Sequence, residues 1–77
     1  MRITFIGAGR VAYHLAKVLH PYHQIVQVFS RDLEKANRLA SLVEATGINH
    51  FDQLNPNTDL VIIAISDQSI ADVIQKI

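Results

Sequence analysis

The chain of 77 residues has room for one domain, which we assign to residues 1–77. Its composition, 49% hydrophobic and 18% charged, is typical of a packed globular core and not of a disordered segment. Seven basic and seven acidic side chains give a formal net charge of zero, which argues against a nucleic-acid partner bound through a broad basic face. Cysteine is absent from the sequence, which excludes disulfides, thiolate metal sites and cysteine nucleophiles.

The hydropathy of the sequence predicts the cellular location of the protein. The longest apolar run, residues 60–65, is too short to cross a bilayer. The apolar residues 3–6 are interrupted at once by Gly7, Gly9 and Arg10, which is unlike a signal peptide. We therefore expect a cytoplasmic protein without a membrane partner. A chain this short buries only about 60% of its unfolded surface, so we expect it to need a partner surface or to be the front piece of a longer polypeptide.

Strands and helices are predicted to alternate along the first half of the chain. A β-prone run at residues 3–6 stops at Gly7, and residues 10–20 follow a helical pattern that Pro21 ends. A second strand is predicted at residues 25–29, apolar enough to be covered on both faces. Ser30 is the predicted N-cap of a second helix that continues until Gly47.

The second half is predicted to add two more strands and a last helix. A weak strand lies around residues 48–50, a loop at 55–59, and the most convincing buried strand at 60–65. Ser66 or Asp67 then caps a helix that runs to Ile77. This order predicts an α/β fold, a Rossmann-type doubly wound parallel sheet with right-handed crossovers, of which about four strands are present. Since the last helix has no C-terminal cap, we expect the domain to be truncated.

The first predicted strand leads into Gly7-Ala8-Gly9-Arg10-Val11-Ala12, a G-x-G-x-x-A pattern. Its first glycine permits a tight turn, its second leaves the backbone open to a pyrophosphate, and the small Ala12 lets the helix pack closely on the sheet. The free N–H groups at the start of the helix would then face the phosphates, helped by the helix dipole. Two glycines at a strand end are often only a tight turn. Here a strand precedes and a helix follows, which favours dinucleotide binding.

The end of the second strand indicates which nucleotide is bound. An NAD-preferring site places an Asp or Glu there to hold the ribose hydroxyls, but this strand ends in Phe29 and Ser30. Arg31 can hold a 2′-phosphate with two hydrogen bonds, Ser30 can offer a hydroxyl, and Lys35 adds a second cation one helical turn later. Two alternatives stay open: Arg31 is an ordinary solvated residue, or Asp32 reaches the ribose and the cofactor is NAD(H). We predict NADP(H).

The fourth predicted strand borders the same site. Ligands of open α/β sheets bind beyond the carboxyl ends of the strands where the strand order reverses, between the strands that end at Ile6 and Ile65. Ile65 and Ser66 are therefore predicted to border the nicotinamide side, although Ser66 and Asp67 can also simply cap the last helix. The four histidines lack a ligand pattern, so no metal site is predicted, and Tyr13 is interpreted as a packing residue.

With Gly7–Val11, Ser30-Arg31 with Lys35, and residues 59–67, the chain resembles the N-terminal domain of a superfamily of oxidoreductases. The superfamily includes pyrroline-5-carboxylate reductases, 6-phosphogluconate and β-hydroxyacid dehydrogenases, and deazaflavin-dependent NADP reductases. The resemblance covers nearly all of the chain and implies pyrophosphate contacts at Arg10 and Val11, 2′-phosphate contacts at Ser30 and Arg31, and nicotinamide contacts at Ile65 and Ser66. It also implies a helical C-terminal domain, absent here, that holds the catalytic residues and the interface of a homodimer.

The expected function is the NADP(H)-binding part of an oxidoreductase that transfers hydride to or from a C=O or C=N group of a small-molecule substrate. The predicted cofactor contacts are Gly7, Ala8, Gly9, Arg10, Val11, Ser30, Arg31, Lys35, Ile65 and Ser66. The alternative is a module that senses a dinucleotide or dimerises without catalysis.

Overall fold

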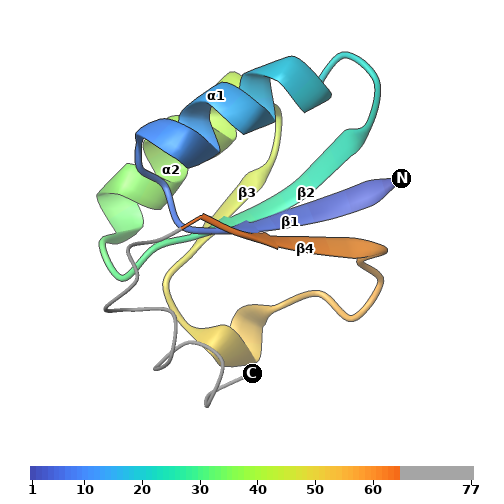
Figure 1. Cartoon of the computed structure of the whole chain (residues 1–77). Helices are drawn as coiled ribbons and strands as arrows, with labels where there is room; N and C mark the ends of the chain where they lie inside the picture. Colours follow the sequence, from blue (N-terminus) through green and yellow to red (C-terminus); the bar gives the residue numbers. More distant parts are fainter. Residues whose placement is uncertain (65–77) are drawn as a thin grey trace.

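Four parallel strands form one sheet, and two helices lie over one of its faces (Figure 1). The computed structural model describes residues 1–64. The strands are β1 (Arg2–Ile6), β2 (Gln24–Phe29), β3 (Thr46–Ile48) and β4 (Leu60–Ile63), in the spatial order β3-β2-β1-β4. The helices are α1 (Arg10–Leu19) and α2 (Leu33–Leu42), and a short 3-10 helix, η1 (Phe51–Gln53), precedes β4. The predicted α/β fold with a parallel sheet is confirmed.

Small residues bring α1 close to the sheet. Its buried residues are Ala12 and Ala16, which contact a core that also contains Phe5 of β1 and Val28 of β2. Among the larger apolar side chains of α1, Val11, Leu15 and Val18 are exposed, while Leu19 is half-buried against the core. Because an alanine adds only a methyl group, the start of α1 can lie directly against the end of β1.

The opposite face of the sheet is covered by the segment between β3 and β4. Phe51 of η1 stacks on Phe29 with ring centroids 4.2 Å apart. Gln27, buried in β2, fastens this segment: its Nε2 donates to the Gln53 carbonyl at 2.8 Å, and its Oε1 accepts from the Asn55 N–H at 2.7 Å. The prediction that β2 is covered on both faces is thereby confirmed.

The start of α2 differs from the prediction. The N-cap is Asp32, not Ser30, because the Asp32 carboxylate accepts a hydrogen bond from the Glu34 N–H at 3.0 Å. Ser30 still belongs to the end of the strand, since its N–H donates to the Ile48 carbonyl at 3.0 Å and extends the β2–β3 pairing. Its hydroxyl accepts from the Asp32 N–H at 3.2 Å and so supports the cap indirectly.

The end of α2 and the third strand also differ. The helix ends at Leu42, and the Ala45 N–H donates to the Ala40 carbonyl at 2.8 Å to close its last turn. Gly47 therefore does not end the helix. It lies inside β3, which is two residues earlier than predicted, and pairs with Val28.

The fourth strand is less buried than predicted. Leu60, Val61 and Ile63 of β4 are each more than a third exposed. The reason is the position of β4 at an edge of the described sheet, where it pairs with β1 on one side only. The predictions for Ile65, Ser66, Asp67 and the last helix lie outside the described residues.

Candidate functional site

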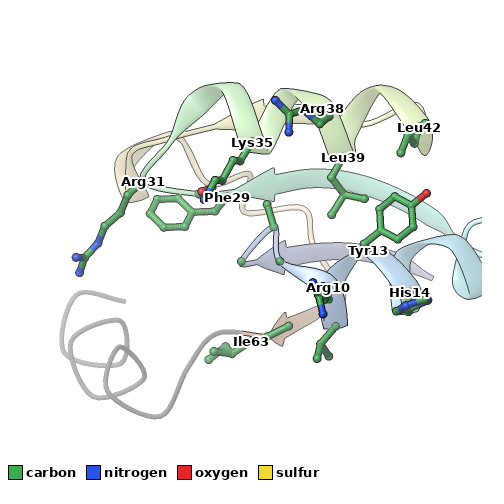
Figure 2. Close-up of a pocket in the computed structure, with 16 residues that line it drawn as sticks. Arg10, Tyr13, His14, Phe29, Arg31, Lys35, Arg38, Leu39, Leu42 and Ile63 are labelled. Carbon is green, nitrogen blue, oxygen red and sulfur yellow. The ribbon is translucent and has the colours of Figure 1, made fainter.

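A cleft of about 1510 Å³ lies at the carboxyl ends of β1, β2 and β4 and continues between α1 and α2 (Figure 2). Since β1 lies between β2 and β4, the order of the strands reverses at this point, which is where open α/β sheets bind ligands. Eight of the ten predicted cofactor contacts line the cleft: Gly7, Ala8, Gly9, Arg10, Val11, Ser30, Arg31 and Lys35. The other two, Ile65 and Ser66, lie outside the described residues, directly after the lining residues Ile63 and Ala64.

The turn after β1 is fixed to both neighbouring strands. Gly7 has a positive φ of 118°, a conformation that side chains with a Cβ rarely adopt. Its N–H donates to the Phe29 carbonyl of β2 at 2.8 Å, and the Ala64 N–H donates to the Ile6 carbonyl at 2.8 Å. The backbone therefore enters α1 along a defined path at the floor of the cleft.

Gly9 leaves the start of α1 open. It is the N-cap residue of α1, and no side chain of the described residues forms a capping hydrogen bond there. A Cβ built on Gly9 would have no described atom within 4 Å, and its φ of −85° and ψ of −163° suit any residue. Neither packing nor backbone conformation requires glycine here. The open space lies beside the unsatisfied N–H groups of a helix start, which is suited to an anion.

Positive charge is concentrated along the cleft. Its lining contains Arg10, Arg31, Lys35 and Arg38, four of the seven Lys and Arg side chains, and no Asp or Glu occurs among the described lining residues. Figure 2 shows Arg31 extended at one end of the cleft, with Lys35 and Arg38 on α2 and Arg10 at the start of α1. Such a set of cations fits a ligand with several phosphate groups.

Asp32, the alternative ribose contact, has another role. Its carboxylate accepts the capping hydrogen bond from the Glu34 N–H, and it is not among the described residues that line the cleft. The position next to Arg31 is therefore occupied by a structural cap. This arrangement favours contact of the ligand with Arg31 rather than with Asp32.

The cleft also contains residues that the sequence analysis missed. Tyr13, interpreted as a packing residue, is 38% exposed and lines the cleft together with His14, Arg38, Leu39 and Leu42. Part of this set follows a helical pattern that could have been used: Lys35, Arg38, Leu39 and Leu42 share one face of α2, at intervals of three and four residues. Figure 2 shows Tyr13 facing this side of α2.

Residues 1–64 contain neither a metal-ligand cluster nor a membrane-spanning helix. No group of three or more His, Asp or Glu side chains there is placed to hold a metal ion. In the same range, none of the helices has the length and apolar character needed to cross a membrane.

The chain is similar to a solved structure and to two named proteins. A protein from Bacteroides fragilis classed as an NADP oxidoreductase superposes with a TM-score of 0.92 and 39% sequence identity, over 97% of this chain and 30% of that one. The L-aspartate dehydrogenase of Methanothermobacter thermautotrophicus is 28% identical over an 80-residue alignment that covers all of this chain and 31% of the enzyme. A Trk system potassium uptake protein homologue of Methanosarcina mazei is 35% identical over a 68-residue alignment that covers 80% of this chain and 16% of that protein. The chain thus spans about a third or less of the length of these relatives.

A family model matches nearly the whole chain. The model described as "NADP oxidoreductase coenzyme F420-dependent" matches residues 2–77. A family of NADP oxidoreductases agrees with the cofactor that the sequence predicts. The chain, with its open glycine turn and its cation-lined cleft, belongs to the family of coenzyme F420-dependent NADP oxidoreductases.

Proposed function

We propose that the chain is the NADP(H)-binding domain of an oxidoreductase that transfers hydride to or from a C=O or C=N group. One observation carries this proposal: a single cleft joins the uncapped start of α1 to four cationic side chains. The backbone N–H groups of a helix start can hold a pyrophosphate, and the cations at the end of β2 and on α2 suit a further phosphate. NADP(H) has both groups, whereas NAD(H) has only the first.

Different residues of the cleft would bind different parts of the cofactor. The backbone from Gly7 to Val11 would hold the pyrophosphate, while Ser30, Arg31 and Lys35 would hold the 2′-phosphate. Ile65 and Ser66, which follow β4, would border the nicotinamide ring. When bound, the nicotinamide supplies the hydride chemistry, and the protein positions it.

The remainder of the enzyme is a proposal of its own. The chain covers 30% of the Bacteroides fragilis structure and 31% of the L-aspartate dehydrogenase, so these relatives contain further regions. By resemblance to pyrroline-5-carboxylate reductases and 6-phosphogluconate dehydrogenases, a helical second domain would supply the substrate contacts, the catalytic residues and the dimer interface. The proposed boundary places the cofactor domain at residues 1–77.

The test is a calorimetric titration of the full native chain with NADPH and with NADH. The Arg31→Ala variant should bind NADPH on the order of 10- to 100-fold more weakly, since a hydrogen bond to a charged group contributes about 1.5–3 kcal/mol. NADH affinity should change little. The matched control is Arg2→Gln, which removes one cation at the amino end of β1, the opposite end of the strand from the cleft. Equal affinity for the two nucleotides, unaltered in Arg31→Ala, would refute the 2′-phosphate assignment.

The Asp32 alternative can be tested in the same titrations. Asp32→Asn retains an acceptor for the Glu34 N–H and so keeps the cap of α2. We expect the affinity for NADH to remain as it is, because the Asp32 carboxylate serves the helix. A selective loss of NADH binding in Asp32→Asn would instead place this carboxylate on the ribose and make the site an NAD(H) site.

A second candidate function is a module that binds a dinucleotide without catalysis. The likeness to a potassium uptake protein favours it, because that relative is not named as an oxidoreductase. Both functions predict NADP(H) binding at the cleft, so turnover discriminates between them. Hydride exchange between NADPH and a carbonyl or imine substrate by the full native chain supports the enzyme; saturable binding without exchange supports the sensor.

A further inference from the structure

We propose that the cleft discriminates between NADP(H) and NAD(H) partly through the rate of association, and that Arg38 is the specificity-determining residue for this step. Arg38 would act through its field on the approaching dinucleotide rather than by contact with the bound one. The proposal rests on the proposed function, since it requires that the cleft bind a dinucleotide.

Arg38 lies away from the expected position of the 2′-phosphate. It follows Lys35 by three residues on α2, about 4.5 Å further along the helix axis from the corner at Ser30 and Arg31. Figure 2 shows Arg38 farther along α2 than Lys35, beside the part of the cleft that contains Leu39 and Tyr13. A phosphate held by Ser30, Arg31 and Lys35 would therefore leave Arg38 as an additional cation beside the same cleft.

Charge on the described part of the molecule is unevenly distributed. The chain as a whole has a formal net charge of zero, yet four cations and no carboxylate line the described cleft. The acidic residues nearest to it in sequence are Asp32 and Glu34, at the start of α2. Asp59 lies at the other end of the sheet, where its carboxylate accepts from the Arg2 N–H at 2.8 Å. Even with Asp32 and Glu34 counted, positive charge exceeds negative charge at the cleft.

A field of this kind favours the more highly charged ligand. A 2′-phosphate adds about two negative charges at neutral pH, as phosphate monoesters do. Clefts lined by charge of one sign raise association rates by about 10- to 1,000-fold, and this gain grows with the charge of the ligand. Arg38 acts within the Debye length of about 10 Å at 0.1 M ionic strength, so its field reaches the entrance of the cleft. NADP(H) should therefore gain more from Arg38 than NAD(H).

The experiment measures association and dissociation rates of NADPH and NADH by stopped-flow fluorescence with the full native chain. Arg38→Gln should lower the association rate of NADPH on the order of twofold to fivefold at low ionic strength, and that of NADH less. The dissociation rates should be unchanged, and the difference from the native chain should disappear near 1 M salt, where the Debye length is about 3 Å.

Two further variants make the result specific to position and sign. Arg2→Gln causes the same change in charge at the amino end of β1, the opposite end of the strand from the cleft, and it should leave the association rates close to native values. Glu34→Gln removes a negative charge one turn before Arg38 and should raise the association rate of NADPH.

The outcomes separate this inference from the proposed function. If the native chain binds no NADPH, both are wrong. If it binds NADPH but Arg38→Gln and Arg2→Gln have equal association rates, only the role of Arg38 is overturned. A faster dissociation in Arg38→Gln that persists at 1 M salt would also overturn it, because Arg38 would then contact the bound dinucleotide.

Discussion

Gly9 and Gly47 occupy two regions of the molecule in which the absence of a side chain has opposite reasons. At the cleft, a Cβ on Gly9 would have no described atom within 4 Å. Between β3 and α2, a Cβ on Gly47 would lie 2.8 Å from the backbone nitrogen of Asn37 and 3.0 Å from the carbonyl carbon of Ala36. Gly47 leaves room for the protein itself, whereas Gly9 leaves room for something outside it. The comparison indicates which glycine serves stability and which serves ligand binding.

Gly9→Ala should break the ligand side of this comparison and give the largest effect. The affinity for NADPH should fall on the order of 100-fold, or about 2.7 kcal/mol, since a methyl group would hold the pyrophosphate away from the backbone N–H groups. The free energy of unfolding without ligand should change by less than about 1 kcal/mol, because the restriction of the unfolded chain by alanine offsets part of the preference of an N-cap position for glycine. Calorimetric titration and urea denaturation measure the two quantities.

The interpretation requires that Gly9→Ala weaken NADPH binding without a matching loss in the free energy of unfolding. A variant that binds weakly and is destabilised by well over about 1 kcal/mol would show that Gly9 is needed for folding. Unchanged NADPH affinity in a stable variant would show that no phosphate approaches this turn. Either result would remove the main support for a dinucleotide site.

Gly47→Ala should have the reverse pattern. The added methyl group would overlap Asn37 and Ala36, so α2 or β3 must shift, and overpacking of this kind costs about 1–3 kcal/mol. Urea denaturation should show that loss in the free energy of unfolding, while the folded protein retains its affinity for NADPH. The comparison would be wrong if Gly47→Ala left stability unchanged but weakened NADPH binding, because the packing of α2 would then control the cleft.

Local patterns predicted the first half of the site well. β1, the glycine turn and α1 are each specified by adjacent residues, so the predicted boundaries agree with Arg2–Ile6 and Arg10–Leu19. The eight described contact residues reach one cleft because the ends of parallel strands meet at one edge of a sheet. The chemistry of the glycine motif predicts that a dinucleotide binds in this cleft. The contact of each single residue with that dinucleotide stays a prediction.

The predictions were wrong where contacts between residues distant in sequence determine the local structure. Glycine often ends a helix, which misled the prediction for Gly47. Its close approach to Asn37 places it in β3 against α2. Ser30 suits an N-cap, yet its pairing with Ile48 keeps it at the strand end and leaves the cap to Asp32. Tyr13 was missed as a lining residue because the approach of α1 to α2 cannot be deduced from either helix alone, whereas Arg38 could have been found from its spacing to Lys35 on α2.

Glu44 extends the comparison of the glycines, because it occupies a position where the backbone conformation favours glycine but glycine is absent. It follows Val43, the C-cap of α2, with a positive φ of 56°, and the next N–H, that of Ala45, donates to the Ala40 carbonyl at 2.8 Å. This is the left-handed position that closes many helices and usually contains glycine. Glu44→Gly should raise the free energy of unfolding by about 0.5–1 kcal/mol, since relief of the left-handed strain exceeds the entropy cost of a glycine. The control is Glu44→Ala, which also removes the carboxylate but keeps the Cβ and should give no gain. If urea denaturation shows the two variants to be equally stabilised, the cause is the charge of Glu44 rather than its backbone, and the effect of a glycine in this chain cannot be inferred from φ at this position.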